Sequence, residues 1–290
     1  MKHRTGSPAE THGTFPRVPG PGSRVPLAES PVPAPPVVLT IAGSDSGGGA
    51  GIQADLKTFH ARGVHGTSAI AAITAQNTRS VNAVHAVPLR HLRAQIAAVF
   101  DDFPVAAVKT GMLGNAATVR LVARELARRQ PPWIVVDPLM IATRGARLLD
   151  ADAMDALIED LIPLADVLTP NLPEAEALVG FAIRSRRDAD AAAEALMAMG
   201  TRSVLLKGGH GRGATVVDRY CDARGMVEIS HPRRAIEGHG TGCTLASAIA
   251  AELAKGAAPR VAVRRAIAYV QRALAAGYRP GGGAAYVLRH

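Results

Sequence analysis

Two glycine-rich segments of the chain could bring backbone N–H groups close to a ligand. The first, residues 42–52, reads Ala-Gly-Ser-Asp-Ser-Gly-Gly-Gly-Ala-Gly-Ile and joins an expected strand to an expected helix. Glycine lets the backbone approach a ligand closely because it carries no Cβ. The segment departs from the Walker A phosphate loop, which ends in Gly-Lys-Ser/Thr, and from the dinucleotide-binding fingerprint. Its glycine content favours a ligand-binding loop over a flexible connector.

The second segment, His-Gly-Thr-Gly-Cys-Thr at residues 239–244, opens an apolar stretch that is expected to be helical. The free N–H groups of a helix N-terminus, aided by the helix dipole, can hold an anion. The same field is expected to lower the pKa of Cys243, which would make its thiol a base or a reactive group. A small residue buried at a tightly packed helix start is the alternative, and for an isolated cysteine it is the more common case. Cys221 has no such setting and is interpreted as structural.

Oxygen donors follow two further strands. Asp137 ends one strand, and Asn171 and Glu174 come just after another with Asn-x-x-Glu spacing. Three such donors at one edge of a sheet could hold Mg²⁺ beside a nucleotide phosphate. Helix capping by Asn171, with Glu174 in the first turn, explains the same spacing equally well.

A lysine and two glycines end another strand, at Lys207, Gly208 and Gly209. A lysine at a strand end, followed by glycines, suits contact with a phosphate, although lysines that face solvent are more common. The histidines carry less information, because neither His210 nor His239 has the spacing of a metal ligand.

Strands and helices must position these motifs, and the hydrophobic pattern predicts a regular alternation of the two. Short Val/Ile/Leu runs alternate with amphipathic stretches, which predicts a doubly wound, mostly parallel sheet with helices on both faces. One hairpin is expected to interrupt the order. Ligands of such sheets bind at the carboxyl ends of the strands, where all the motifs above fall. The expected strands are 37–42, 68–74, 105–109, 133–137, 166–169 and 203–207, the hairpin is 214–220 with 226–230, and the helices are 51–62, 89–100, 116–129, 151–161, 187–199, 241–255 and 259–276.

Composition bounds the remaining choices. A chain of 290 residues with 48% hydrophobic and 20% charged residues can bury a large core without metal or disulfide support. Two cysteines and the lack of a long uncharged apolar run predict a cytoplasmic protein with no membrane span. The net charge of +9 comes mainly from scattered arginines, and aromatic residues make up 3% of the chain, so no nucleic-acid partner is expected.

The N-terminal part has a different composition. Nine of the 20 prolines lie in residues 1–36, without apolar periodicity and without the apolar core of a secretory signal. Such a segment buries too little to offset its ordering entropy. It is therefore predicted to be a disordered extension, followed by a single domain at residues 37–290.

Taken together and in this order, the motifs closely resemble those of the bacterial hydroxymethylpyrimidine/phosphomethylpyrimidine kinases, within the ribokinase-like superfamily. The resemblance spans residues 37–277, and its first and last segments together are highly specific. The segments that carry it are 40–59, 74–78, 109–113, 136–138, 169–175, 207–210 and 239–245.

The resemblance implies a three-layer ribokinase-like fold and a two-step activity in thiamine biosynthesis. ATP would phosphorylate 4-amino-5-hydroxymethyl-2-methylpyrimidine to its monophosphate and then to the diphosphate. Mg²⁺ and a homodimer are implied as well. By residue match, the pyrimidine would be bound by Gly43, Asp55, Gln76 and Met112. ATP would be bound by Lys207, Gly208, Gly209, Asn171 and Glu174, and the metal by Asp137 and Glu174. Gly240, Thr241 and Gly242 would form the anion hole, and Cys243 would take the place of a catalytic Asp.

This assignment leads to a hypothesis about Cys243. A hydroxyl acceptor gains from a nearby base, whereas a phosphate acceptor is already ionised. Replacing Cys243 by Ala should therefore harm the first phosphorylation more than the second.

Two departures and two rivals accompany the resemblance. The chain has Ala146 where the family often has an acid, and its C-terminal Gly281-Gly282-Gly283 lacks the family's proline. The rivals are a pyridoxal kinase of the same superfamily and a catalytically silent sensor that binds the pyrimidine. Gln76 and Met112 fit the pyrimidine pattern without excluding pyridoxal.

Overall fold

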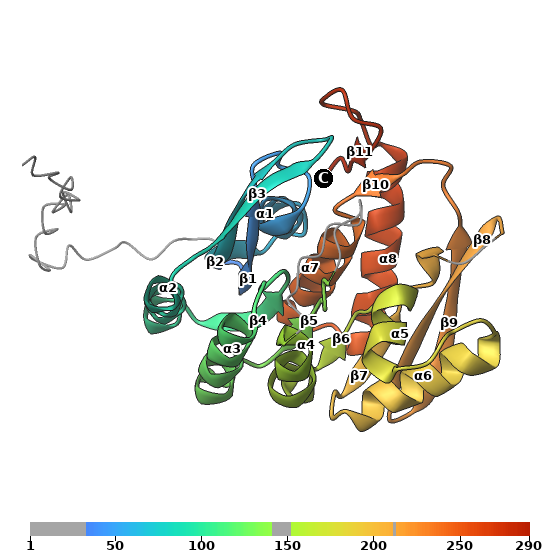
Figure 1. The fold of residues 1–290 in the computed structure, drawn as a ribbon, viewed down its shortest axis with the longest axis horizontal. Coiled ribbons are helices and arrows are strands. Elements are labelled where there is room, and N and C mark those ends of the chain that lie inside the picture. Colours follow the sequence, from blue (N-terminus) through green and yellow to red (C-terminus); the bar gives the residue numbers. More distant parts are fainter. Residues whose placement is uncertain (1–32, 141–151, 211–212) are drawn as a thin grey trace, which may run out of the picture. The chain divides into compact units, whose positions relative to one another are not determined.

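The computed structural model describes residues 33–140, 152–210 and 213–290, and within them one sheet organises the chain (Figure 1). The strand order is β3-β2-β1-β4-β5-β6-β7-β8-β9. The pairs β2–β3, β7–β8 and β8–β9 are antiparallel, and the other neighbours are parallel. The strands are β1 (Val37–Asp45), β2 (His65–Gln76), β3 (Val81–Ala86), β4 (Val105–Thr110), β5 (Ile134–Val136), β6 (Val167–Leu168), β7 (Ser203–Leu206), β8 (Thr215–Asp222) and β9 (Gly225–Pro232).

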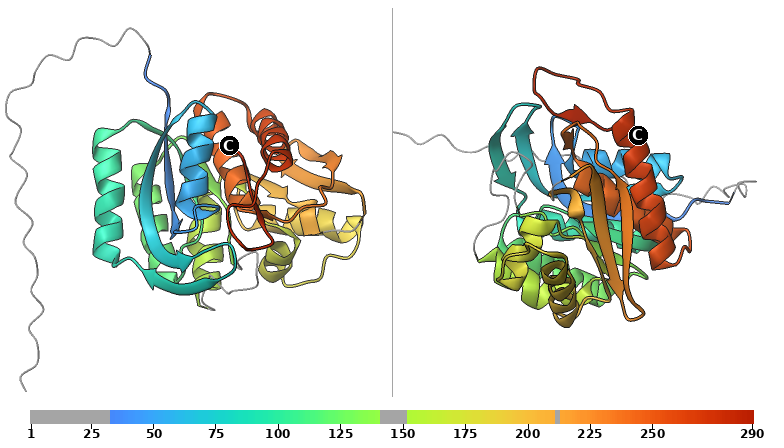
Figure 2. Two further views of the ribbon diagram at one scale, coloured as in Figure 1. Left: turned by 90° about the horizontal axis from the view of Figure 1, so that it is seen from above. Right: turned by 90° about the vertical axis from the view of Figure 1, so that its right-hand side faces the viewer.

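Helices cover both faces of this sheet, which confirms the predicted three-layer architecture (Figure 2). One face carries α1 (Gly51–Ala61), α7 (Thr241–Ala254) and α8 (Pro259–Ala275). The opposite face carries α2 (Leu89–Asp102), α3 (Ala116–Arg129), α4 (Ala153–Ala156), α5 (Leu172–Val179) and α6 (Arg186–Ala198), with a π-helical turn at Leu157–Leu161 and 3₁₀ turns at Ile162–Leu164 and Gly208–His210.

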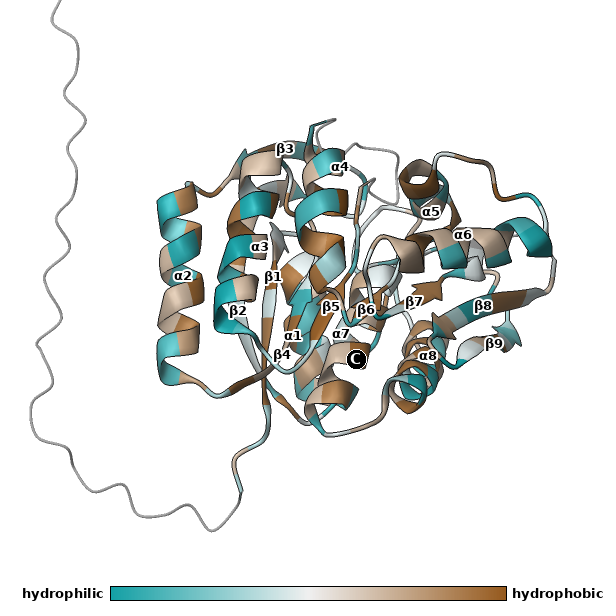
Figure 3. Cartoon of the chain, turned by 90° about the horizontal axis from the view of Figure 1, so that it is seen from below, coloured by the Kyte–Doolittle hydropathy of each residue, from teal (hydrophilic) through white to brown (hydrophobic). Residues whose placement is uncertain are grey.

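The alternation of side chains along each strand divides the core between the two layers. On β1, Val37 and Leu39 pack into the layer of α2 to α6, whereas Val38 between them packs into the layer of α1, α7 and α8. Successive strand residues point to opposite faces, so a continuous apolar run is what a strand covered on both sides requires. Helices α2, α3 and α6 show mixed hydrophilic and hydrophobic colours, as expected for one buried and one solvated face (Figure 3).

Several elements differ from the predicted ones. Strand β3 was not expected, because its residues are mostly exposed at the sheet edge and form no apolar run. The two-residue strands β10 (Gly238–His239) and β11 (Tyr286–Val287), which pair with each other, were not expected either, and α5 was implied only by the capping interpretation of Asn171. The helix predicted at 151–161 is α-helical only at Ala153–Ala156 before it widens into the π-helical turn.

Residues 35–290 form one compact unit. Residues 1–32 of the predicted extension, and the departure from the family pattern at residues 142–147, lie outside the described residues. In the described part of the chain, no helix is long and apolar enough to cross a membrane. Cys221 and Cys243 are both free and buried.

Candidate active site

A cavity opens at the carboxyl ends of β1, β2 and β4. The order of strands along the chain reverses between β1 and β4, and crevices at such a reversal are where doubly wound sheets bind ligands. Three predicted pyrimidine-binding residues and the four predicted anion-hole and catalytic residues line this cavity together. The lining residues are Gly43, Ser44, Asp45, Ala50, Gly51, Thr74, Gln76, Met112, Leu139, His239, Gly240, Thr241, Gly242 and Cys243.

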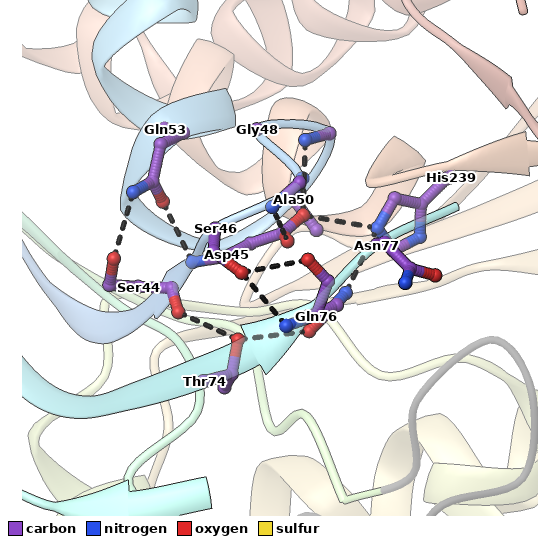
Figure 4. Close-up of polar contacts among 12 residues, drawn as sticks. Ser44, Asp45, Ser46, Gly48, Ala50, Gln53, Thr74, Gln76, Asn77 and His239 are labelled. Atoms are coloured by element: carbon purple, nitrogen blue, oxygen red, sulfur yellow. Dashed lines mark hydrogen bonds and ion pairs between the residues drawn. The ribbon is translucent and has the colours of Figure 1, made fainter. Parts of the chain in front are cut away.

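The first glycine-rich loop is held in shape by Asp45 (Figure 4). The Asp45 carboxylate accepts hydrogen bonds from the backbone N–H groups of Gly47 at 2.7 Å, Gly49 at 3.0 Å and Ala50 at 2.8 Å. Burial opposes ionisation of Asp45, but these bonds and the neighbouring His239 outweigh it and lower the pKa of Asp45. A loop tied at three N–H groups is ordered, which argues against the flexible-connector alternative.

The two glycine-rich segments meet at the start of α7. Gly240 is the N-cap of α7 with φ of 80°, a conformation that favours glycine, and a Cβ there would collide with the carbonyl oxygen of Gly49. No side chain caps α7, so the N–H groups of its first turn are left for a ligand. This arrangement fits the predicted anion hole.

Cys243 lies in that first turn, but its acidity differs from the prediction. Burial raises the pKa of Cys243 to about 11, although the ammonium of Lys109 and a hydrogen bond from the Gly51 N–H act in the opposite direction. The thiol is only 5% exposed. The expectation of a lowered pKa was wrong because loss of hydration outweighs the field of the helix terminus.

Gln76 and His239 close one side of the cavity. The Gln76 Nε2 atom lies 3.1 Å from His239 Nε2, which is also 3.2 Å from Asp45 Oδ2. The sequence alone did not predict a role for His239, because this residue lacks the spacing of a metal ligand. The available signal was its position at the head of the His-Gly-Thr-Gly-Cys segment.

Met112 and Gly43 form an apolar part of the wall. Met112 is 7% exposed, and its terminal methyl group occupies the space where a Cβ on Gly43 would lie. Any larger residue at Gly43 would therefore displace the methionine from the cavity wall.

Asp55 does not line the cavity, which corrects the prediction that it contacts the pyrimidine. Its carboxylate is fully buried and accepts hydrogen bonds from Lys109 Nζ at 2.8 and 2.9 Å, Thr40 Oγ1 at 2.7 Å and Ser247 Oγ at 2.7 Å. A buried carboxylate with this many internal donors has no oxygen left for a ligand. Asp55 instead joins α1, β1, β4 and α7 below the cavity.

The predicted metal ligands lie around Lys207. The Lys207 Nζ atom is 3.0 Å from Asp137 Oδ1 and 3.8 Å from Glu174 Oε2. Burial raises the pKa of Glu174 to about 7, opposed by Lys207 and reinforced by Asp137. The lysine itself loses hydration, yet the two carboxylates outweigh that loss and raise the pKa of Lys207.

The capping and metal-binding interpretations of Asn171 and Glu174 turn out to be compatible. Asn171 Oδ1 accepts from the Glu174 N–H at 2.9 Å, and Glu174 Oε2 accepts from the Asn171 N–H at 2.8 Å, which is a capping box at the start of α5. The other Glu174 oxygen, Oε1, and Asp137 Oδ2 are buried without a hydrogen-bond partner. Two unpartnered carboxylate oxygens suit a hard cation such as Mg²⁺. Among the described residues, however, no cluster of three ligating side chains occurs.

A second cavity lies on the other side of the α7 N-terminus. Thr241 and Gly242 line both cavities, so the two spaces meet at the anion hole. Of the predicted strand-end loop, Lys207 and Gly209 face this cavity, whereas Gly208 donates its N–H to Asp218 Oδ1 at 2.8 Å. Val216, Leu245, Ile267, Val270 and Leu274 supply apolar walls, and Asp218, His231, Arg233 and Gln271 supply polar groups. These four polar groups were not identified from the sequence.

The match to known proteins covers most of the chain. Residues 45–287 match the family model described as phosphomethylpyrimidine kinase. The chain is 52% identical over 248 residues to a hydroxymethylpyrimidine/phosphomethylpyrimidine kinase of Rhizobium meliloti, covering 84% of this chain and 92% of that protein. It is 49% identical over 244 residues to the protein of the same description from Haemophilus influenzae, covering 82% and 90%.

A solved structure extends the comparison to the fold. The structure of Bacillus subtilis pyridoxal kinase in complex with ADP is similar with a TM-score of 0.82 and 35% sequence identity, covering 89% of this chain and 98% of that chain.

Proposed function

We infer the roles of the two cavities from the premise that this chain belongs to the phosphomethylpyrimidine kinase family. Its activity is that of a hydroxymethylpyrimidine/phosphomethylpyrimidine kinase in thiamine biosynthesis. The observation that carries the assignment of roles is the junction of two cavities at Thr241 and Gly242. Phosphoryl transfer needs an acceptor and a donor on either side of groups that stabilise negative charge.

The first cavity is the acceptor site for the pyrimidine. Gln76 offers an amide that can pair with an aminopyrimidine edge, and Met112 offers an adaptable apolar wall. Cys243 lines the cavity next to the anion-hole residues Thr241 and Gly242, where the hydroxymethyl group would meet the transferred phosphoryl group.

The second cavity is the donor site for ATP. Its apolar walls suit a nucleobase, while Lys207 and the N–H groups at the start of α7 suit the phosphates. The B. subtilis pyridoxal kinase, which shares the fold, was solved with ADP. Asp137 and Glu174 would hold Mg²⁺ through their unpartnered oxygens, and the ion would neutralise charge on the phosphates.

Cys243 would accept the proton of the hydroxymethyl group in the first step. The second step needs no such base, because a phosphate acceptor is ionised already. Cys243→Ala should therefore lower kcat/KM for the first phosphorylation by about 100-fold and affect the second by less than about threefold. Equal losses in both steps would contradict a role as the base.

The decisive experiment is mass spectrometry of the products after incubation with Mg-ATP and, separately, hydroxymethylpyrimidine or pyridoxal. The monophosphate and then the diphosphate of the pyrimidine are expected, with slower turnover of pyridoxal. The likeness to a pyridoxal kinase makes that second substrate the relevant competitor. Pyridoxal phosphate alone would reassign the acceptor cavity, and tight pyrimidine binding without product would indicate a silent sensor.

A homodimer is the expected assembly, by resemblance to the family, with no nucleic-acid or membrane partner. Light scattering during gel filtration tests this directly, because a 30.1 kDa chain would elute as a particle of twice that mass.

A further inference from the structure

The C-terminal part of the chain returns to the wall of the acceptor cavity. After α8, the chain forms a loop and then β11, which lies beside β10 (Figures 1 and 2). Tyr286 pairs with Gly238 and Val287 with His239, and the Tyr286 N–H donates to the Glu237 carbonyl at 2.8 Å. The C-terminal strand thus holds the backbone of His239 from outside the cavity.

The glycine run of this part of the chain contacts Thr78, in the turn that follows the cavity residue Gln76. The Gly283 N–H donates to Thr78 Oγ1 at 3.1 Å, and the Arg279 guanidinium donates to the Gly283 carbonyl at 2.9 Å. A Cβ on Gly283 would collide with the carbonyl oxygen of Thr78, and one on Gly281 would lie 2.6 Å from Thr78 Oγ1. Glycine is therefore required for this close approach to the turn between β2 and β3.

The pairing of β11 with β10 and the contact of Gly283 with Thr78 lie next to His239 and Gln76, the two residues whose side chains meet at the edge of the cavity. Thr78 is two residues after Gln76, and Val287 pairs with His239. Gln76 and His239 are 163 positions apart in the sequence, yet their side chains lie 3.1 Å from each other. Residues 279–287, here called the C-terminal clamp, contact the segment of each.

The clamp also packs against the first glycine-rich loop, at Gly49. At Gly49 the space for a Cβ is taken by His239 Cδ2 at 2.6 Å and Val287 Cγ2 at 3.1 Å. Val287 is 4% exposed, so it is a packed residue. Three segments of the cavity wall therefore pack against one short piece of chain.

We propose that the C-terminal clamp preorganises the acceptor cavity and that Thr78 and Gly283 are positioning residues for pyrimidine binding. The proposal rests on the assignment of this cavity to the pyrimidine. A binding group that is already held in place loses less conformational freedom when the ligand arrives, so its hydrogen bond contributes more to affinity. The contacts of the clamp described above join three segments of the acceptor cavity, and they reach the lining of the ATP cavity at Gly238, so its effect should fall mainly on the acceptor.

Thr78 provides the first test. Thr78→Val removes the hydroxyl acceptor of the Gly283 N–H while keeping the side-chain shape, and Thr78→Ser keeps the acceptor. Thr78→Val should raise KM for hydroxymethylpyrimidine about three- to tenfold, as expected for one lost hydrogen bond. The KM for ATP and kcat at saturating pyrimidine should stay within about twofold, and Thr78→Ser should behave like the parent chain.

Adjacent glycines provide a matched pair. Gly283→Ala forces a Cβ against the backbone of Thr78, whereas the atoms nearest to a Cβ on Gly282 belong to the end of the Arg79 side chain. Gly283→Ala should raise KM for the pyrimidine at least as much as Thr78→Val, and Gly282→Ala should change it by less than about twofold. Calorimetric titration with hydroxymethylpyrimidine, without nucleotide, checks the same order in affinity.

Gln76→Ala separates failure of the clamp from failure of the site. If Gln76→Ala raises KM for the pyrimidine while Thr78→Val and Gly283→Ala do not, the clamp is refuted and the cavity assignment stands. If Gln76→Ala leaves the KM for the pyrimidine unchanged, the assignment of this cavity to the pyrimidine is refuted, and so is the proposal about the clamp that rests on it. Equal increases in the KM values for ATP and pyrimidine would reduce the clamp to a general structural role and also refute the proposal.

Discussion

Cys243 is the residue whose chemistry depends most on its surroundings. A thiol at a helix N-terminus is acidic when it is exposed, but this one is buried, and its pKa is about 11. At neutral pH the thiol is therefore mostly protonated, and any role as a base must draw on a small thiolate fraction.

That fraction leads to a prediction about pH. Because the thiolate population grows about tenfold per pH unit below the pKa, kcat/KM of the first phosphorylation should rise steeply between pH 6 and pH 9. The second phosphorylation should vary much less over the same range. Initial rates measured with each substrate across these pH values test this, with Cys243→Ala as the control that should flatten the first profile. A flat first profile in the parent chain would mean that Cys243 is not the base.

At the scale of elements, the ion pair of Asp55 and Lys109 joins α1 to β4 beneath the acceptor cavity. Both side chains are fully buried, and Thr40 of β1 and Ser247 of α7 complete the hydrogen bonds of the carboxylate. Burial opposes the charge on Lys109, but the nearby Asp55 and other anionic groups raise the pKa of Lys109 above its ordinary value. Lys109 therefore stays charged, and its pair with Asp55 joins the helix layer to the sheet.

Replacing one residue of the Asp55–Lys109 pair should show how much the pair contributes to the free energy of unfolding. Lys109→Met leaves a buried carboxylate without its cation and should lower the free energy of unfolding by about 3–5 kcal/mol. The double change Asp55→Leu with Lys109→Met should recover most of that loss, since neither charge remains. Urea unfolding at pH 7 measures both. Arg93→Met is the control, because Arg93 is 65% exposed in its pair with Glu125 and should cost less than about 1 kcal/mol.

At the scale of the whole molecule, Glu252 ties together the helix layer of α1, α7 and α8. Its carboxylate pairs with Arg62 just after α1, with Lys255 at 2.6 Å and with Arg265 of α8 at 3.1 Å. Burial would raise the pKa of Glu252, but the hydrogen bonds from these three cations outweigh it and lower the pKa to about 2.

This lowered pKa predicts how stability depends on acid. A carboxyl group that ionises more readily in the folded state contributes stability above its ordinary pKa of 4.5 and loses that contribution as the pH falls toward 2. Glu252→Gln should therefore lower the free energy of unfolding by about 1.5–3 kcal/mol at pH 7, and the difference from the parent chain should shrink below pH 4.5. Asp101→Asn, which alters an exposed ion pair, should cost less than about 1 kcal/mol. Urea unfolding of all three chains at several pH values is the measurement, and a constant difference for Glu252→Gln would contradict the assignment.

The parts predicted correctly from the sequence are those governed by local patterns. Apolar runs such as Val37 to Ile41 specify strands covered on both faces, because side chains alternate along a strand. Glycines and polar residues directly after those strands place the binding motifs at one edge of the sheet. The motif order, rather than any single motif, was specific enough to indicate the kinase family.

Only the tertiary structure decided what each of those residues can do. The burial of Asp55, the raised pKa of Cys243 and the contact of Lys207 with both Asp137 and Glu174 depend on segments far apart in the chain. The same is true of Thr78 and Gly283, which are 205 positions apart. Local residue type sets the chemistry a side chain can offer, but hydration and charge depend on its neighbours in space, and those neighbours exist only once the sheet and its two helix layers have assembled.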